Sequence, residues 1–151
     1  MHFREMTAAD VPSTFLIRTA AKENPLTLTG MKSLGITVES VRGHIATTHK
    51  GYICEIDGVV VGFVIADNRS GELWVLAVWP EHEGKGIGRQ LLVLAQDWLF
   101  SQGWDKLWLT TGITPSHALK LYTKLGWTVV GTLPHGGSYK MELSKMLTSS
   151  R

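Results

Sequence analysis

A series of glycines between an apolar segment and an amphipathic segment is the feature that most limits how this chain can fold. Residues 75–79 are apolar, Pro80 follows them, and glycine stands at every second position from Gly84 to Gly88. Glycine adopts left-handed backbone conformations and lets a ligand approach the main chain closely. A helix that starts after such a loop offers free N–H groups and a positive dipole end, which attract an anion. The segment predicts a strand–loop–helix unit that binds a phosphate-bearing ligand; a turn that binds nothing is the alternative.

Two common phosphate-binding motifs do not fit this loop. A P-loop requires a lysine followed by serine or threonine, but Lys85 is followed by Gly86. A dinucleotide-binding fingerprint requires a third glycine at the position that Arg89 occupies. The missing lysine–hydroxyl pair also argues against an ATP-binding protein. The loop therefore belongs to another kind of phosphate site.

The hydrophobic pattern of the whole chain predicts an α/β fold with the order β-α-α-β-β-β-α-β-α-β-β. Asp57-Gly58 is typical of a hairpin turn, and Pro25–Gly35 is expected to be a loop. The helix after the glycine loop carries apolar residues at helical spacing from Leu91 to Trp98. This order predicts a mixed, mostly antiparallel sheet flanked by helices. The strands are expected at residues 3–6, 53–56, 59–66, 72–78, 106–110, 127–132 and 138–143.

Composition limits the classes of function. The 151 residues are 44% hydrophobic and 19% charged, which predicts one globular domain over residues 1–151. The net charge of +2, without a basic stripe, argues against nucleic acid as a partner. No apolar segment is long enough for a membrane span or a signal peptide, so a cytoplasmic protein without a membrane partner is expected. Cys54 is the only cysteine, and the six histidines lack metal-ligand spacing, so neither a disulfide nor a bound metal is expected.

Two segments carry a resemblance to a known family. The loop from Glu83 to Gly88 resembles the acyl-CoA loop of the GNAT superfamily of N-acetyltransferases, [QR]-x-x-G-x-[GA], with glutamate where glutamine or arginine is usual. Residues 118–127, ALKLYTKLGW, resemble the A-x-x-x-Y-x-K-x-G-[FW] segment of the same family. Pro115 stands where an asparagine is often found. The resemblance covers the whole chain and is specific between about Glu72 and Gly131.

The resemblance implies an acetyl-CoA-dependent N-acetyltransferase. The acetyl group would move from acetyl-CoA to a primary amine of a small molecule or a peptide, by direct attack in a ternary complex. No metal is implied, and a homodimer is common in the family. The two departures, Glu83 and Pro115, keep a second interpretation open, in which the chain is a non-catalytic acyl-CoA-binding or regulatory module.

The resemblance also assigns roles to residues. The backbone N–H of Val78 would polarise the thioester carbonyl, and Tyr122 would protonate the CoA sulfur. A tyrosine of the hydrophobic core is the alternative for Tyr122. The resemblance also implies a set of residues that contact acetyl-CoA: Leu76, Ala77, Val78, Glu83, Gly84, Lys85, Gly86, Ile87, Gly88, Arg89, Ser116, Leu119 and Tyr122.

Glu72 is the best candidate for the general base that deprotonates the amine. Strand alternation predicts that it shares a face with Trp74, Leu76 and Val78, where apolar neighbours would raise its pKa. A solvated glutamate is the alternative, and a chain of water molecules would serve equally as the base. His82 is expected to be exposed, and Pro25–Gly35 and His135–Tyr139 are expected to flank the acceptor.

Overall fold

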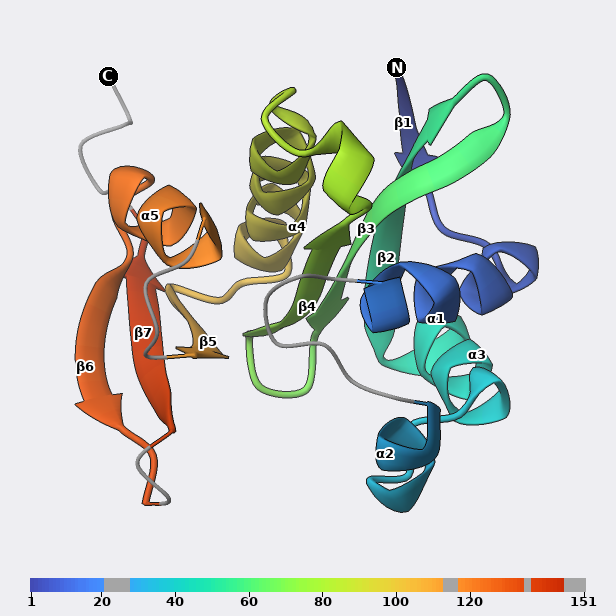
Figure 1. Cartoon of the computed structure of the whole chain (residues 1–151). Coiled ribbons are helices and arrows are strands. Elements are labelled where there is room, and N and C mark those ends of the chain that lie inside the picture. The colour runs from blue at the N-terminus through green and yellow to red at the C-terminus, as the bar shows by residue number, and fades with distance from the viewer. Residues whose placement is uncertain (21–27, 113–116, 135–136, 146–151) are drawn as a thin grey trace.

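A seven-stranded mixed sheet forms the centre of the molecule (Figure 1). The computed structural model describes residues 1–20, 28–112, 117–134 and 137–145. The strand order is β1-β2-β3-β4-β5-β7-β6, and every neighbouring pair is antiparallel except β4 and β5. The mostly antiparallel sheet predicted from the sequence is thus confirmed. The strands are β1 His2–Glu5, β2 His49–Ile56, β3 Val59–Asp67, β4 Glu72–Val78, β5 Lys106–Gly112, β6 Thr128–Thr132 and β7 Ser138–Ser144.

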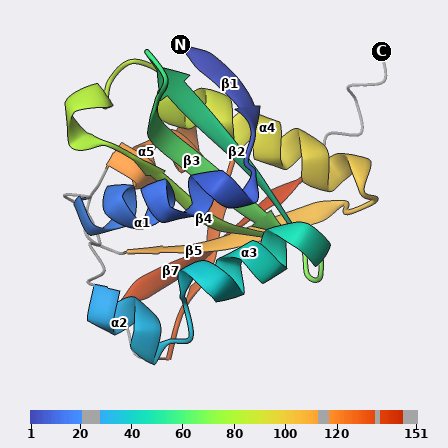
Figure 2. The ribbon, with the colours of Figure 1, turned by 90° about the vertical axis from the view of Figure 1, so that its right-hand side faces the viewer.

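Helices cover both faces of the sheet. Figure 2 shows α1 and α3 on one face and α4 and α5 on the other. Two short 3₁₀ helices, η1 and η2, precede α1 and α4. The bounds are η1 Ala8–Asp10, α1 Val11–Ala20, α2 Leu28–Ser33, α3 Val38–Thr47, η2 Pro80–His82, α4 Ile87–Ser101 and α5 His117–Lys124.

The helix α2 corrects the expectation of a loop over Pro25–Gly35. Residues 25–27 lie outside the described part of the chain, but Leu28–Ser33 is helical. Met31 is fully buried and fixes this helix to the core. A helix of six residues is less than two turns long, so its sequence cannot show a repeating apolar face.

Each face of the sheet has its own hydrophobic core. The core on the α4 face includes Leu91, Leu92 and Trp127. Within it, the indole N–H of Trp127 donates a hydrogen bond of 2.9 Å to the Gln96 side chain, which ties the end of α5 to α4. The core on the other face contains residues of α1, α2 and α3, with Met31 among them. The two cores hold α1 and α4 on opposite sides of β4.

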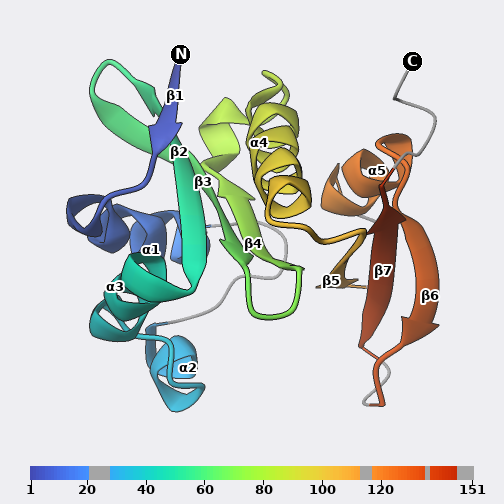
Figure 3. The ribbon, with the colours of Figure 1, turned by 180° about the vertical axis from the view of Figure 1, so that it is seen from behind.

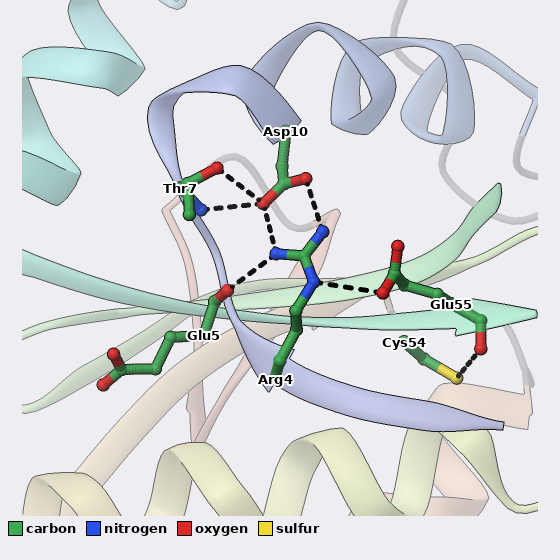
Figure 4. Close-up of polar contacts among 6 residues, drawn as sticks. All are labelled: Arg4, Glu5, Thr7, Asp10, Cys54 and Glu55. Carbon is green, nitrogen blue, oxygen red and sulfur yellow. Dashed lines mark hydrogen bonds and ion pairs between the residues drawn. The ribbon is translucent and has the colours of Figure 1, made fainter. Parts of the chain in front are cut away.

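A polar cluster joins the first strand to η1 and β2 (Figure 4). The Arg4 guanidinium donates two hydrogen bonds to the Asp10 carboxylate, at 2.8 and 2.9 Å, and one of 3.1 Å to Glu55. The same carboxylate accepts hydrogen bonds from the N–H and the hydroxyl of Thr7. The bonds from Arg4 and Thr7 lower the pKa of Asp10. This cluster fixes the start of α1 against the sheet.

Candidate active site

The strands β4 and β5 separate soon after they meet. They pair only at Glu72 and Trp108, whereas β5 pairs with β7 from Lys106 to Gly112. Figure 3 shows the result on the scale of the molecule: β6, β7 and α5 lie to one side, and β1 and β2 with α1 and α3 lie to the other. A cleft of about 470 Å³ lies between the two parts and is lined by residues of β4, β5, α1, α4 and α5.

The backbone of β4 exposes donors to this cleft. The N–H of Trp79 donates to the carbonyl of Val61 in β3, at 2.8 Å. In an antiparallel pair, residues alternate between those that bond the partner strand and those that point away from it. Val78, which lies opposite Gly62, therefore points its N–H away from β3 and toward the side where β5 has separated. Val78 itself lines the cleft.

The glycine loop forms one wall of the cleft. Gly84 and Gly86 have φ angles of 81° and 83°, in the left-handed region that favours glycine. A Cβ atom on either residue would meet no heavy atom within 4 Å, so open space lies beside the loop. Gly86 is the N-cap of α4, and the free N–H groups of the first turn of that helix follow it. The loop thus presents a helix N-terminus to an open space, as an anion site requires.

Tyr122 lines the same cleft from α5. Its side chain is buried, and the centre of its ring lies 6.0 Å from that of Trp127. Burial raises the pKa of Tyr122. The hydroxyl therefore keeps its proton throughout the neutral pH range. The side chain is at once a core residue and a wall of the cleft, so the two interpretations drawn from the sequence do not exclude each other.

The prediction for the face of Glu72 was wrong. A bulge at Trp74 breaks the alternation of β4, because Val75 pairs with Ile65 while Leu73 pairs with the next residue, Ala66. Trp74 and Val75 consequently both pack on the α1 face, whereas Leu76 and Val78 pack on the α4 face.

Glu72 therefore shares a face with Trp74 but not with Leu76 or Val78. It is half-buried where β4 and β5 meet, and it does not line the cleft. Burial raises its pKa.

Most of the residues expected to contact acetyl-CoA line the cleft. Those that do are Leu76, Ala77, Val78, Glu83, Gly84, Gly86, Ile87, Gly88, Arg89 and Tyr122. Lys85 and Leu119 do not line it, and Ser116 lies outside the described residues. The Lys85 ammonium instead lies 2.9 Å from Nδ1 of His82.

The sequence reasoning missed other residues of the cleft. His82 was expected to be exposed but is half-buried and lines the cleft. Arg18 was not singled out because a lone arginine on an amphipathic helix gives no pattern in the sequence. The remaining missed residues are Leu73, Trp74, Val75, Thr110, Thr111, Ala118 and Leu121.

The described residues lack two features that would point to other classes of protein. No group of three or more histidine, cysteine, aspartate or glutamate residues there is arranged to hold a metal ion. None of the helices in that part of the chain is both long and apolar enough to cross a membrane.

The sequence also matches a family model. Residues 27–127 match the model of the acetyltransferase (GNAT) family, and this segment contains β4, the glycine loop, α4 and α5. The chain belongs to the GNAT acetyltransferase family.

Curated proteins and solved structures similar to this chain include three acetyltransferases. Mycothiol acetyltransferase of Thermobispora bispora is 34% identical over 86 residues, which cover 51% of this chain and 29% of that protein. The chain thus spans less than a third of the length of that relative.

Two solved structures are also similar. The PaiA N-acetyltransferase of Thermoplasma acidophilum, solved in complex with coenzyme A, has a TM-score of 0.81 at 20% identity, and the match covers 95% of this chain and 98% of the PaiA chain. The ribosomal-protein-S18-alanine N-acetyltransferase of Escherichia coli has a TM-score of 0.74 at 20% identity over 99% and 97% of the two chains. Both structures share the fold.

Proposed function

We propose that this chain transfers an acetyl group from acetyl-CoA to a primary amine by direct attack in a ternary complex. One observation carries the proposal: the opening between β4 and β5 brings a strand N–H, a glycine loop at a helix N-terminus and a buried tyrosine into one cleft. Membership of the GNAT family supports it. So does the similarity to a mycothiol acetyltransferase and to a structure that holds coenzyme A.

The residues of the cleft fit acetyl-CoA. The loop from Glu83 to Arg89 would hold the pyrophosphate, because left-handed glycines keep its backbone open and the first turn of α4 supplies N–H groups. The backbone of Leu76 and Val78, which points away from β3, would bond the pantetheine arm as a neighbouring strand would, with Ala77 between them. Lys85, Ser116 and Leu119 remain predicted contacts of the same ligand.

Three groups of the chain would act on the transfer. The amine nitrogen attacks the thioester carbonyl carbon, and the N–H of Val78 donates to the carbonyl oxygen as negative charge develops there. The carbon–sulfur bond then breaks, and Tyr122 gives its proton to the departing sulfur. The amine nitrogen loses a proton as the amide forms, and this proton restores the phenolate of Tyr122 to its neutral form. Because burial raises the pKa of Tyr122, the hydroxyl is protonated and able to act as a donor at neutral pH.

Glu72 is the proposed base, and it would act through water. It lies outside the wall of the cleft, but its neighbours Leu73 and Trp74 are part of that wall. Its raised pKa suits a base better than that of an exposed carboxylate. Glu72→Gln should therefore lower kcat and remove the acidic limb of the pH–rate profile. An unchanged profile would assign the step to water without Glu72.

The test of the proposal is the substitution Tyr122→Phe. With acetyl-CoA and a panel of small amines and short peptides, release of the CoA thiol should fall by about a hundredfold or more. The affinity for coenzyme A should stay the same, because the ring remains in place. Thermal unfolding should show stabilisation by acetyl-CoA and coenzyme A but not by ATP or NAD. Stabilisation without amine-dependent thiol release would instead favour the non-catalytic acyl-CoA-binding module.

A further inference from the structure

Arg18 is a half-buried cation without an anionic partner in the described part of the chain. It lies on α1 and lines the cleft. Asp10 pairs with Arg4, and Asp67 pairs with Arg69. The half-buried carboxylate of Glu72 is influenced by the charges of Asp67 and Arg69, and it forms no ion pair with Arg18. The contact found for Arg18 is with the ring of Trp74, whose centre is 6.0 Å from the guanidinium carbon.

This arrangement has an energetic cost for folding. Removing a charge from water is unfavourable unless an opposite charge or good hydrogen bonds replace the water. A cation 6.0 Å from an aromatic ring gains little, because that distance is at the limit of the interaction. Burial lowers the pKa of Arg18. An anion bound in the cleft would remove this penalty.

The position of Arg18 separates it from the expected pyrophosphate site. The α1 helix and Trp74 lie on one face of the sheet, whereas the glycine loop leads into α4 on the other. The other arginine of the cleft wall, Arg89, is in the first turn of α4, next to the loop. The carboxylate of the wall, Glu83, also belongs to the loop. Among the described residues, the α1 end of the cleft therefore carries a single positive charge.

We propose that the acceptor amine also carries a carboxylate, and that Arg18 binds this carboxylate. The inference rests on the proposed function, since it names the class of amine that enters the same cleft. A guanidinium matches a carboxylate with two parallel hydrogen bonds. One fixed charge suits a monoanionic carboxylate better than a phosphate, which carries more charge. Arg18 is therefore a specificity-determining residue of the acceptor end of the cleft.

The test compares matched amines that differ only in the carboxylate. The probes are the common amino acids, their amides and the corresponding decarboxylated amines, each with acetyl-CoA. A separate set contains primary amines that carry a phosphate in place of the carboxylate. The protein should prefer the carboxylate member of its best set in kcat/KM by about tenfold to a hundredfold, as a charge-assisted pair predicts. In Arg18→Met this ratio should fall close to one, because KM of the carboxylate member rises. The decarboxylated amine should keep its turnover.

Two further variants control the test. Arg18→Lys keeps the positive charge but loses the two parallel hydrogen bonds of the guanidinium. It should retain part of the preference for the carboxylate member, and it shows whether the site tolerates substitution. Arg42→Met removes a positive charge from α3, outside the cleft wall, and should leave the ratio unchanged. Each variant is checked for coenzyme A affinity and thermal unfolding.

The outcomes separate the two proposals. Equal turnover of both members by the unsubstituted protein, or an unchanged ratio in Arg18→Met, would overturn the inference and leave the proposed function intact. Preference for the phosphates over the carboxylates would overturn the assignment of a carboxylate. No acetylation of any probe by a protein that acetylates other amines or short peptides would overturn the inference and leave the proposed function intact.

Discussion

At the scale of single residues, the conformation of Gly86 should decide how well the loop binds its ligand. Its φ of 83° is strained for any residue with a Cβ, although the Cβ would meet no atom within 4 Å. Gly86→Ala should therefore cost about 1–2 kcal/mol of stability through strain without a clash. If the loop relaxes by changing shape, the affinity for coenzyme A falls roughly tenfold. Both quantities can be measured by thermal unfolding and calorimetric titration.

A matched control exists at the other end of the same helix. Gly103 has a φ of 104°, and its Cβ would also meet no atom within 4 Å. Gly103→Ala should lose similar stability but no affinity for coenzyme A. An equal loss of affinity in both variants would mean that the loop around Gly86 does not hold the ligand.

The residues of the site differ in how far the sequence reveals them. The glycine loop was predictable because only glycine tolerates its backbone, and this requirement leaves a visible spacing in the sequence. The face of Glu72 was not predictable, because it depends on a bulge at Trp74 that the pattern of β4 does not announce. Arg18 enters the cleft through the packing of α1 on the sheet, which no local pattern encodes. Its role, like that of Glu72, stays a prediction.

At the scale of elements, the position of α4 depends on a glycine in β3. A Cβ on Gly62 would lie 3.1 Å from Ile87 and 3.2 Å from Leu91, two buried residues in the first turns of α4. Gly62→Ala should push the start of α4 away from the sheet by a few tenths of an ångström. We expect a loss of about 1–3 kcal/mol of stability, as in other overpacked cores. Weaker binding of coenzyme A should accompany it, measured by titration.

The control for this prediction is a strand glycine with space around it. Gly131 lies in β6, and its Cβ would meet no atom within 4 Å. Gly131→Ala should leave both stability and coenzyme A affinity nearly unchanged. If Gly62→Ala behaves in the same way, the close contact of α4 with β3 is not what positions the loop.

The order of elements followed from the sequence because long elements repeat their apolar pattern several times. The prediction was wrong for α2, which is too short for a repeat. The separation of β4 from β5 is implied by the family resemblance, but it does not follow from the residue pattern of either strand. It accompanies the pairing of β5 along its whole length with β7, a strand that comes later in the chain and lies on the other edge of β5. The cleft is thus a product of topology, and the sequence shows only the groups that line it.

At the scale of the whole molecule, a buried histidine should make folding stability depend on pH. His49 has a side chain only 2% exposed; the Thr48 hydroxyl lies 2.6 Å from its Nδ1, and the Asp67 carboxylate lies 3.5 Å from its Nε2. These contacts suit a neutral ring that accepts from Thr48. Burial lowers the pKa of His49 from its ordinary 6.5 to about 4, against the opposing effect of Asp67.

The direction of the pH dependence follows from proton binding. Between pH 6.5 and 4 the unfolded chain binds a proton at His49 that the folded chain does not, so the stability from this group is complete above pH 6.5 and is lost as pH falls toward 4. The loss is on the order of 3 kcal/mol. Urea unfolding at a series of pH values should show this slope, and His49→Gln should flatten it.

Asp10→Asn is the comparison, because the lowered pKa of Asp10 places its loss of stability below pH 3.8. The Asp10 variant should keep the slope above pH 4 and weaken the one below it. A slope above pH 4 that survives in His49→Gln would show that a group other than His49 controls the acid response of the fold.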